Sequence, residues 1–342
     1  MIRKLASVRR IGEIKPIKNA DNLELALIDG WQTVVQKGEL KQNDVCIYFE
    51  IDSFLPIEER YEFLRKSSYK KLYDGSEGFR LRTIKLRGEL SQGLALPFHL
   101  FPEIKSYKIG DDVSELLKIR KYEPPLPACL SGYAKGTFPS FIQKTDEERI
   151  QNLLEYFDVY KDIEFEVTEK LDGTSASYYF NENIGGVCSR NLELQDFDNN
   201  NTYWTIERRL GLLDILKSEK RNLAIQGEII GEGINSNRLG IKGQEFYVYH
   251  IWDIDNRRYF VQKERLDFVL KHHLFHVPIL GNAIIFSEFN TVGKLLDYAN
   301  GISLLNNKRK REGLVFKSTE LVENKIISFK AVSNEYLLGG GE

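Results

Sequence analysis

Three prolines lie close together at residues 122–127, in the sequence YEPPLP, and they divide the chain into two parts. A proline ring fixes the φ angle, so a segment this rich in proline is typical of a linker. We therefore expect a linker over residues 121–140, between a first domain at 1–120 and a second domain at 141–342. A chain of 342 residues has the length of two domains.

The first domain is rich in short runs of strand-forming residues. Apolar stretches at 26–35, 45–51 and 78–98 are separated by turn residues such as Gly30 and Asn43. Short strands divided by tight turns are typical of a small β-barrel, and we expect one here.

The second domain mixes strands and helices, which predicts an α+β fold. We expect strands at 165–167, 176–180, 223–230, 246–252 and 313–317. We expect helices at 203–216, 263–273 and 291–299, the last ended by Gly301. A further helix should begin at Thr145, because Thr145 and Glu148 match a capping box. An apolar stripe follows it, made of Ile150, Leu153, Leu154 and Phe157.

Composition excludes several classes of protein. The chain has 48 Lys and Arg against 50 Asp and Glu, a net charge of −2, which excludes a uniformly basic nucleic-acid protein. No run of 18 apolar residues is present, so we expect no membrane span. Three scattered cysteines, Cys46, Cys129 and Cys188, argue against a disulfide framework. With no apolar leader at the start, these features predict an intracellular protein, cytoplasmic or nuclear.

Local charge differs from the average. Residues 65–87 hold eight Lys and Arg against Asp74 and Glu77, with Tyr69, Tyr73 and Phe79 interleaved. Cations and aromatic rings together suit a nucleic acid, whose phosphates meet the cations and whose bases meet the rings. The alternative is an ordinary solvated face. A second basic run, at 308–311, either faces a substrate or is a solvated loop.

The segment most suggestive of chemistry is EKLDGT at 169–174. It lies between two expected strands, so Lys170 can point into a cleft while Asp172 and Gly173 bend the backbone. Taken alone, such a segment is more often a surface turn. Further segments follow it in order: SRN at 189–191, QGEIIG at 226–231, FYVYHIWD at 246–253, REGLVFK at 311–317 and ISFK at 327–330.

This order and spacing resemble the six collinear motifs of covalent nucleotidyltransferases, the polynucleotide ligases and mRNA capping enzymes. The resemblance is strongest to the ATP-dependent, nick-sealing RNA ligases of the Deinococcus and Naegleria type, and it covers about residues 140–340. KTDEERIQN at 144–152 and FKAVSNEYLL at 329–338 also resemble segments of those enzymes. In the first domain, 20–24 and 85–94 resemble OB-fold tRNA-binding modules.

The resemblance implies an N-terminal OB-fold barrel followed by a nucleotidyltransferase domain built on antiparallel sheets. It also implies RNA repair: sealing of 3′-OH/5′-phosphate nicks, with ATP and Mg²⁺ or Mn²⁺ as cofactors. The expected partner is a nicked duplex with RNA on the 3′-OH side, bound by a monomer that does not associate with membranes.

The nucleophile should be Lys170. An ordinary lysine has a pKa of about 10.4, so the amine must lose its proton before it can attack. Lys317, Lys330 and a bound metal ion could lower the pKa by supplying nearby positive charge. Lys170 would attack the α-phosphorus of ATP, forming lysyl–AMP. The AMP would pass to a 5′-phosphate, and a 3′-OH would displace it to seal the strand.

The resemblance assigns the other roles. Lys317 and Lys330 join Lys170 in catalysis by clamping the α-phosphate. The implied ATP-binding set is Arg149, Glu169, Lys170, Arg190, Glu228, Tyr249, Glu312, Lys317 and Lys330. Tyr249 would stack on adenine, with Phe246 as the rival. The metal ion would be held mostly through water by Asp172, Glu228 and Glu312.

One position departs from the pattern. The last motif in many relatives is Lys-x-Lys, whereas Ser328 and Lys330 stand at the matching positions here. Either Ser328 replaces a cation, or Lys325 reaches in from a shifted position.

Other functions have weaker support. An mRNA capping guanylyltransferase shares the Lys170 motif, but its OB domain normally follows the last motif, as it does in DNA ligases. A non-catalytic RNA-binding protein would not need Lys170, Glu228, Glu312 and Lys330 together. The histidines at 272, 273 and 276 have no acidic or cysteine partner at ligand spacing, so we interpret them as structural. Gly227, Gly231 and Gly233 precede no Gly-Lys-Ser/Thr, which excludes a P-loop.

Overall fold

The computed structural model describes residues 3–124, 132–197 and 201–339. The chain forms two compact units, one made of Met1–Pro125 with Leu337–Glu342 and the other of Leu126–Tyr336. Half of the proline-rich segment and Cys129 lie outside the described residues. Cys46 and Cys188 are buried free thiols, and no helix in the described ranges is long and apolar enough to cross a membrane.

The first unit consists mainly of short antiparallel strands, as expected. They are β1 (Ala6–Arg10), β2 (Glu13–Pro16), β3 (Leu23–Ile28), β4 (Trp31–Gln36), β5 (Val45–Phe49), β6 (Ser53–Leu55), β7 (Tyr69–Lys71), β8 (Glu77–Arg80), β9 (Thr83–Leu86), β10 (Glu89–Gln92), β11 (Leu94–Pro97) and β12 (Arg120–Lys121). One short helix, α1 (Arg65–Ser68), precedes β7. Turn chemistry explains the spacing: Asp29 and Gly30 both have positive φ, which forms the two-residue turn joining β3 to β4.

The strands of this unit form several small sheets rather than one closed barrel. Within the described residues the orders are β1-β5-β11, β2-β3-β4, β9-β10 and β12-β6-β8-β7. Side chains join β4 to β10 where a backbone ladder is missing: the Ser91 hydroxyl accepts a hydrogen bond from the Val34 N–H at 3.0 Å. The expected barrel is therefore not closed among the described residues, and short sheets pack around a core that includes Val8, Ile47 and Phe49.

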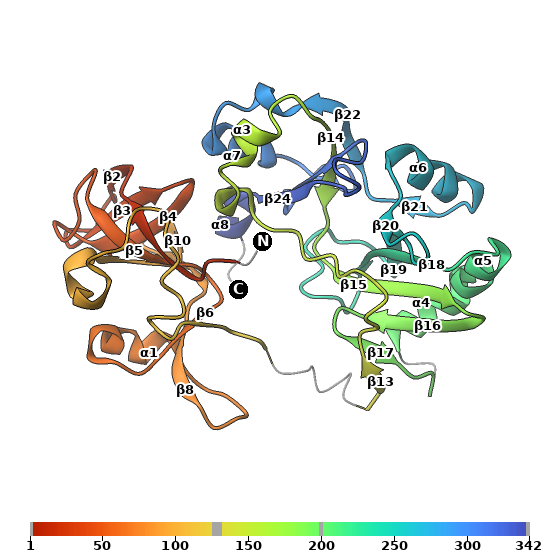
Figure 1. Cartoon of the computed structure of the whole chain (residues 1–342), viewed down its shortest axis with the longest axis horizontal. Helices are drawn as coiled ribbons and strands as arrows, with labels where there is room; N and C mark the ends of the chain where they lie inside the picture. The colour runs from red at the N-terminus through yellow and green to blue at the C-terminus, as the bar shows by residue number, and fades with distance from the viewer. Residues whose placement is uncertain (1–2, 125–131, 198–200, 340–342) are drawn as a thin grey trace. The chain divides into compact units, whose positions relative to one another are not determined.

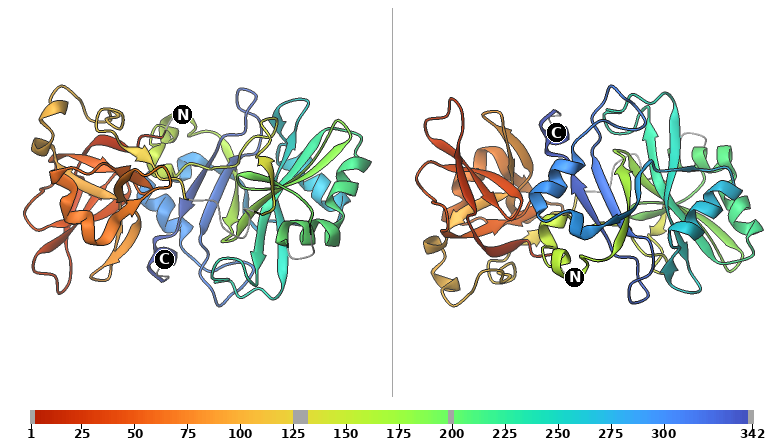
Figure 2. Two further views of the ribbon diagram at one scale, coloured as in Figure 1. Left: turned by 90° about the horizontal axis from the view of Figure 1, so that it is seen from below. Right: turned by 90° about the horizontal axis from the view of Figure 1, so that it is seen from above.

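The second unit is built on two sheets, as Figures 1 and 2 show. The larger has the order β13-β17-β16-β15-β18-β19-β20, with β21 beside β19, and the smaller has the order β22-β14-β23-β24. The strands of the larger sheet are β13 (Ala134–Thr137), β15 (Thr174–Asn181), β16 (Ile184–Ser189), β17 (Leu192–Leu194), β18 (Leu223–Gly231), β19 (Gln244–Asp253), β20 (Arg258–Tyr259) and β21 (Phe275–His276). Those of the smaller are β14 (Glu164–Lys170), β22 (Ile279–Ile285), β23 (Gly313–Ser318) and β24 (Ser328–Val332). Every pairing is antiparallel except β19 with β21.

Helices cover the outer face of each sheet. Helices α4 (Thr202–Leu210), α5 (Leu212–Ser218) and α6 (Gln262–Lys271) bury apolar side chains against the larger sheet. Helix α7 (Val292–Ala299) packs on the smaller sheet, and its first turn is capped by the Thr291 hydroxyl. The helix expected at 203–216 is divided in two because Gly211 adopts a left-handed conformation with φ of 63°.

The prediction of a helix that begins at Thr145 is wrong. Residues 143–148 form neither helix nor strand, and only a 3-10 turn at Ile150–Asn152 and the short helix α3 (Tyr156–Val159) follow. Tertiary contacts replace the capping box, because the Glu148 carbonyl accepts from the Lys330 N–H at 2.8 Å and its carboxylate accepts from the Arg149 N–H at 2.9 Å. The apolar stripe is still buried, because Ile150 and Leu153 join the core of the smaller sheet.

The chain passes from one sheet to the other at 171–173. Strand β14 ends in the smaller sheet at Lys170, and β15 begins in the larger sheet at Thr174. Gly173 is required at this crossing, since a Cβ there would meet the Ile229 carbonyl oxygen at 2.3 Å. The connection places Lys170 and Asp172 at the seam between the two sheets.

Candidate active site

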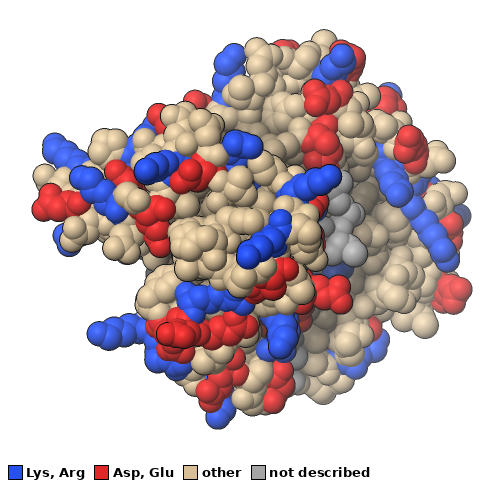
Figure 3. Space-filling view, turned by 60° about the vertical axis from the view of Figure 1, so that its left-hand side comes forward, with Lys and Arg blue, Asp and Glu red and all other residues tan. Residues whose placement is uncertain are grey.

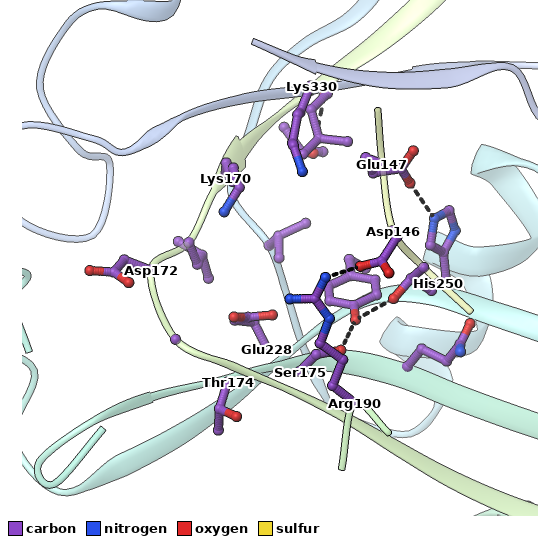
Figure 4. Close-up of a pocket in the computed structure, with 18 of the residues that line it drawn as sticks. Asp146, Glu147, Lys170, Asp172, Thr174, Ser175, Arg190, Glu228, His250 and Lys330 are labelled. Atoms are coloured by element: carbon purple, nitrogen blue, oxygen red, sulfur yellow. Dashed lines mark hydrogen bonds and ion pairs between the residues drawn. The ribbon is translucent and has the colours of Figure 1, made fainter. Parts of the chain in front are cut away.

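A pocket opens at this seam, and it is lined by segments far apart in the sequence. Strands β14, β15, β18, β19, β23 and β24 contribute to it, together with residues 144–147. Figure 4 shows the amines of Lys170 and Lys330 pointing into the pocket, with the carboxylate of Glu228 facing them from β18. Ligand-binding sites are commonly clefts with a few convergent polar groups.

Lys170 lies at the end of β14 among carboxylates. Its Nζ donates to the Glu312 carboxylate at 2.6 Å. Burial opposes the charge, but Glu312, Glu228 and Asp172 outweigh it and raise the pKa of Lys170 above its ordinary value. We expected neighbouring lysines to lower this pKa. That expectation is wrong for the protein alone, because the acidic groups dominate around Nζ.

Of the acidic side chains near Lys170, Glu228 has a shifted pKa. Burial, with Glu312 and Asp172 nearby, raises the pKa of Glu228 to about 8 even though Lys170 acts in the opposite direction. The second oxygen of Glu312 is buried without a hydrogen-bond partner among the described residues. Within those ranges no three His, Cys, Asp or Glu side chains group closely enough to hold an ion directly. The donor set therefore suits a cation held through its water shell.

Two further lysines line the pocket, of which Lys317 is buried and Lys330 is partly buried. Burial, then the charge of Arg265, lowers the pKa of Lys317 to about 7, and its Nζ donates to the Tyr249 carbonyl at 2.6 Å. Burial, then Lys170 and Arg149, lowers the pKa of Lys330 to about 8. A phosphate bound beside either amine would favour the protonated, charged form of that amine.

The two arginines of the expected set occupy different positions. Arg190 follows β16, lines the pocket and forms an ion pair with Asp146 at 2.5 Å. Arg149 forms a backbone bridge with Lys330 on β24 and is not among the residues that line the pocket. Arg149 therefore lies next to Lys330 rather than in the cleft itself.

Tyr249 faces the pocket and lies at a β-bulge. The register of β18 with β19 shifts between Gln226 and Gly227, opposite Tyr249. Tyr249 lines the pocket, and its hydroxyl lies 2.6 Å from the Ser175 hydroxyl and 3.0 Å from that of Thr145. Phe246 is 1% exposed and packs edge-on against Tyr178 in the core, so the rival assignment is wrong.

Glu169 is turned away from the pocket. Its carboxylate is buried and accepts a hydrogen bond from the Leu304 N–H at 2.8 Å, on the loop before β23. Successive side chains of a strand point to opposite faces, so Glu169 and Lys170 cannot both face the cleft. Glu169 is nevertheless among the residues that line the pocket, and its expected place in the ATP-binding set stays a prediction.

The structure places Ser328 beside the pocket and Lys325 away from it. The Ser328 hydroxyl donates to Glu147 at 2.5 Å. Lys325 pairs with Val322 in the turn before β24 and does not line the pocket. Ser328 therefore occupies the position of the missing lysine and binds an acid instead of supplying a cation.

Sequence reasoning missed an acid–histidine pair at the deep end of the pocket. Glu147 lies 3.3 Å from the Nε2 atom of His250, and both side chains are largely buried. Burial raises the pKa of Glu147 and lowers that of His250 far below its ordinary value, so the histidine is neutral. The signal was hidden because 145–148 matched a helix start, whereas the segment is irregular and its side chains meet residues of distant strands.

Comparisons with known proteins agree with this arrangement. An OB-fold domain model matches residues 5–98, and an RNA ligase model matches residues 163–332. No curated protein sequence matches the chain. Among solved structures, a mutant of Naegleria gruberi RNA ligase with AMP and Mn is 46% identical, with a TM-score of 0.85 and 99% of each chain covered. Another mutant of that protein, with ATP and Mn, is 46% identical with a TM-score of 0.84, covering 98% of this chain and 99% of the other.

Proposed function

The chain belongs to the RNA ligase family, and from this premise we propose that it is an ATP-dependent ligase that seals 3′-OH/5′-phosphate nicks in RNA repair. One observation carries the proposal. Lys170 stands at the seam of the two sheets, paired with Glu312, in a pocket that Glu228, Lys317 and Lys330 also line. Such a site can bind a triphosphate and present an amine to it.

The first step is the formation of lysyl–AMP. The Lys170 Nζ loses a proton, for which the Glu312 carboxylate at 2.6 Å is the nearest acceptor. Its lone pair then attacks the α-phosphorus of ATP, the N–P bond forms, and pyrophosphate leaves with the electrons of the broken P–O bond. The family's solved structures with ATP or AMP and Mn support the choice of nucleotide and cation.

The second and third steps transfer and consume the AMP. An oxygen of the RNA 5′-phosphate attacks the phosphorus of lysyl–AMP, which frees Lys170 and gives an adenylylated 5′ end. The 3′-OH of the neighbouring strand then attacks that 5′-phosphate, the phosphodiester forms, and AMP leaves. Each step develops negative charge on phosphate oxygens, which preorganised cations stabilise.

The contacts of each residue with ATP are proposed from the family resemblance, and the places of the residues in the structure support them. Lys317 and Lys330 would hold the α-phosphate, Arg190 the ribose or phosphate, and Arg149 the β- and γ-phosphates from its place beside Lys330. The ring of Tyr249 would stack on adenine, braced by its two hydroxyl contacts.

The acids would hold a Mg²⁺ or Mn²⁺ ion by its water shell. The carboxylates of Asp172, Glu228 and Glu312 gather near Lys170, which supports a cation site there. Such an ion neutralises charge on the phosphates. Positive charge close to Nζ would also favour the unprotonated amine that the first step needs.

The first unit would bind RNA on the 3′-OH side of the nick. Several cations of the 65–87 segment are used internally, since Arg65 pairs with Glu62 and Arg80 with Asp52. Ion pairs are not found within the described ranges for Lys66, Lys70, Arg82 and Arg87. Tyr73, at the turn of the β7–β8 hairpin, is 88% exposed, so its ring is available for stacking.

The protein surface is not uniformly basic. Figure 3 shows Lys and Arg side chains interspersed with Asp and Glu. We therefore infer that RNA contact depends on a few local cations and on Tyr73, and that a monomer suffices for sealing. An RNA substrate would place the enzyme in the cytoplasm or the nucleus.

Covalent labelling tests this function. Incubation with α-phosphate-labelled ATP and Mn²⁺ should give a labelled protein that survives denaturation in the wild type and is absent in Lys170→Ala. Lys263→Ala, on the exposed face of α6, is the matched control and should label normally. The labelled enzyme should then seal a nicked duplex with RNA on the 3′-OH side. Labelling by GTP would indicate a capping enzyme instead, and absence of any label would leave only RNA binding.

A further inference from the structure

The Asp172 carboxylate accepts hydrogen bonds from two side chains that come from distant parts of the second unit. The Tyr336 hydroxyl donates to one carboxylate oxygen at 2.5 Å, and the Asn235 amide donates to the other at 2.9 Å. The same Asn235 nitrogen also donates to the Gly173 carbonyl at 2.9 Å, so the turn and its carboxylate are held together. Neither Tyr336 nor Asn235 belongs to the site residues identified from the sequence.

Each partner is itself held in place. Tyr336 lies in helix α8 (Asn334–Gly339), and its N–H donates to the Ser333 hydroxyl at 3.1 Å. The Ser333 hydroxyl in turn donates to the Asn300 side chain at 2.7 Å. The guanidinium of Arg238 covers the Tyr336 ring at 4.6 Å from its centre, so the tyrosine is fixed on both sides.

Asn235 lies on the loop between β18 and β19, in a left-handed conformation with φ of 45°. This region is costly for most residues, but asparagine tolerates it comparatively well. The loop also carries Arg238, so one segment supplies both the amide that binds Asp172 and the cation that covers Tyr336. The two contacts therefore form a single unit around the turn at 171–173.

We propose that Tyr336 and Asn235 are positioning residues, which orient the Asp172 carboxylate toward the water shell of the divalent cation. The inference rests on the proposed function. A carboxylate on a turn would otherwise rotate about its side-chain bonds, and each oxygen keeps free lone pairs for water after accepting one bond. Groups that orient the outer ligands of a metal ion commonly change its affinity by about 10-fold or more when removed.

The position of Tyr336 adds a link to the phosphate site. Helix α8 directly follows β24, the strand that carries Lys330. The same short segment thus supplies a cation for the α-phosphate and the hydroxyl that orients Asp172. The arrangement keeps the acid and the lysine at a constant separation across the site.

The test measures nucleotide binding rather than catalysis. In a Lys170→Ala background, which cannot form lysyl–AMP, ATP affinity is measured by calorimetry with Mn²⁺ and again with EDTA. Tyr336→Phe should reduce the gain in ATP affinity caused by Mn²⁺ by about 10-fold and should leave the affinity in EDTA unchanged. Tyr160→Phe, a partly buried tyrosine of the same unit outside the pocket, is the control.

A double substitution separates positioning from general structure. In an Asp172→Asn background, Tyr336→Phe should have no further effect on the Mn²⁺ gain, because the group it orients is already altered. An equal loss in both backgrounds, or no loss in either, would overturn the inference. Lysyl–AMP formation by the wild type is measured separately, so failure of the proposed function would be distinguished from failure of this inference.

A second variant keeps the proposal testable if Tyr336→Phe does not fold. If Tyr336→Phe lowers the melting temperature strongly, Asn235→Gly carries the same test, because glycine accepts the positive φ and lacks the amide. It should reduce the Mn²⁺ gain in the same selective manner. An unchanged Mn²⁺ gain in a folded Asn235→Gly protein would count against the proposal.

Discussion

At the scale of single residues, the environment of Lys330 lowers the pKa of its amine, and a bound anion would raise that pKa. Burial, with Lys170 and Arg149 nearby, lowers its pKa to about 8, so at pH 8 about half of the molecules carry a neutral amine. A bound phosphate stabilises the charged form and raises the pKa again. ATP binding should therefore be accompanied by proton uptake in this pH range.

We expect ATP binding at pH 8 to take up a proton, and the uptake to shrink at pH 6, where Lys330 is already charged. Calorimetry in two buffers of different ionisation enthalpy measures the uptake. It should fall clearly in Lys330→Met, leaving the part due to Lys317, whose pKa is about 7. An uptake that is identical in Lys330→Met and the wild type would show that this amine does not sense the nucleotide.

Tyr249 allows a second test at this scale. Tyr249→Ala should weaken ATP binding by about 10-fold, the equivalent of a 1.4 kcal/mol stacking contribution. Tyr249→Phe keeps the ring and should lose less. The comparison is Phe246→Leu, which alters the core beside Tyr178 and should lower the melting temperature without changing ATP affinity. Binding measured by fluorescence and thermal unfolding would separate the two effects, and a larger affinity loss in Phe246→Leu would refute the assignment.

At the scale of elements, the crossing from β14 to β15 organises the site. It places Lys170 at the end of one sheet and Asp172 next to the other, and it requires a close approach to β18 at Gly173. Burial of the neighbouring strands means that the backbone cannot move aside easily. The glycine is thus part of the geometry that brings the nucleophile and the acids together.

Gly173→Ala should destabilise the protein by about 1–3 kcal/mol, the usual cost of forcing extra atoms into a packed site. The added Cβ would meet the Ile229 oxygen at 2.3 Å, so either β18 or the turn must shift, and lysyl–AMP formation should fall as well. Gly136→Ala is the matched control, because no atom lies within 4 Å of its added Cβ. Urea unfolding curves check the difference, and equal midpoints for the two variants would contradict this account.

At the scale of the whole molecule, nucleotide chemistry and RNA binding are proposed for different units. The residues proposed for nucleotide chemistry all lie in Leu126–Tyr336, whereas the exposed cations and Tyr73 proposed for RNA binding lie in Met1–Pro125. Formation of lysyl–AMP and capture of RNA should therefore respond to different substitutions. This separation can be tested with the full chain.

The double variant Lys66→Glu, Lys70→Glu should form lysyl–AMP at the wild-type rate but bind a nicked RNA duplex about 10-fold more weakly. Charge reversal removes two phosphate contacts, so the salt dependence of binding should also become shallower. Lys41→Glu, an exposed residue of the same unit outside the 65–87 segment, is the control. Unchanged RNA affinity and salt slope in the double variant would place the RNA surface elsewhere.

Local patterns alone predicted most of the elements of the second unit. The expected strands at 165–167, 176–180, 223–230, 246–252 and 313–317 are all confirmed within β14, β15, β18, β19 and β23. Strand-forming runs and turn residues act over a few positions, so their preference is visible in the chain itself. The motif order, from which the family was inferred, is likewise a property of the sequence, and the family is confirmed.

Contacts between distant residues decided the rest. Thr145 and Glu148 match a helix start, yet the segment is not helical, and Lys330 and Tyr249 bind it from other strands. Three further features arise from such contacts: the bulge at Tyr249, the hydrogen bond between Ser328 and Glu147, and the hydrogen bond from Tyr336 to Asp172. The sequence by itself determined most of the strands, their order and the choice of Lys170 as the candidate nucleophile, because these depend on local preferences and motif spacing. Only the tertiary structure decided which side chains face the pocket and what charge they carry, because burial and long-range pairing set both.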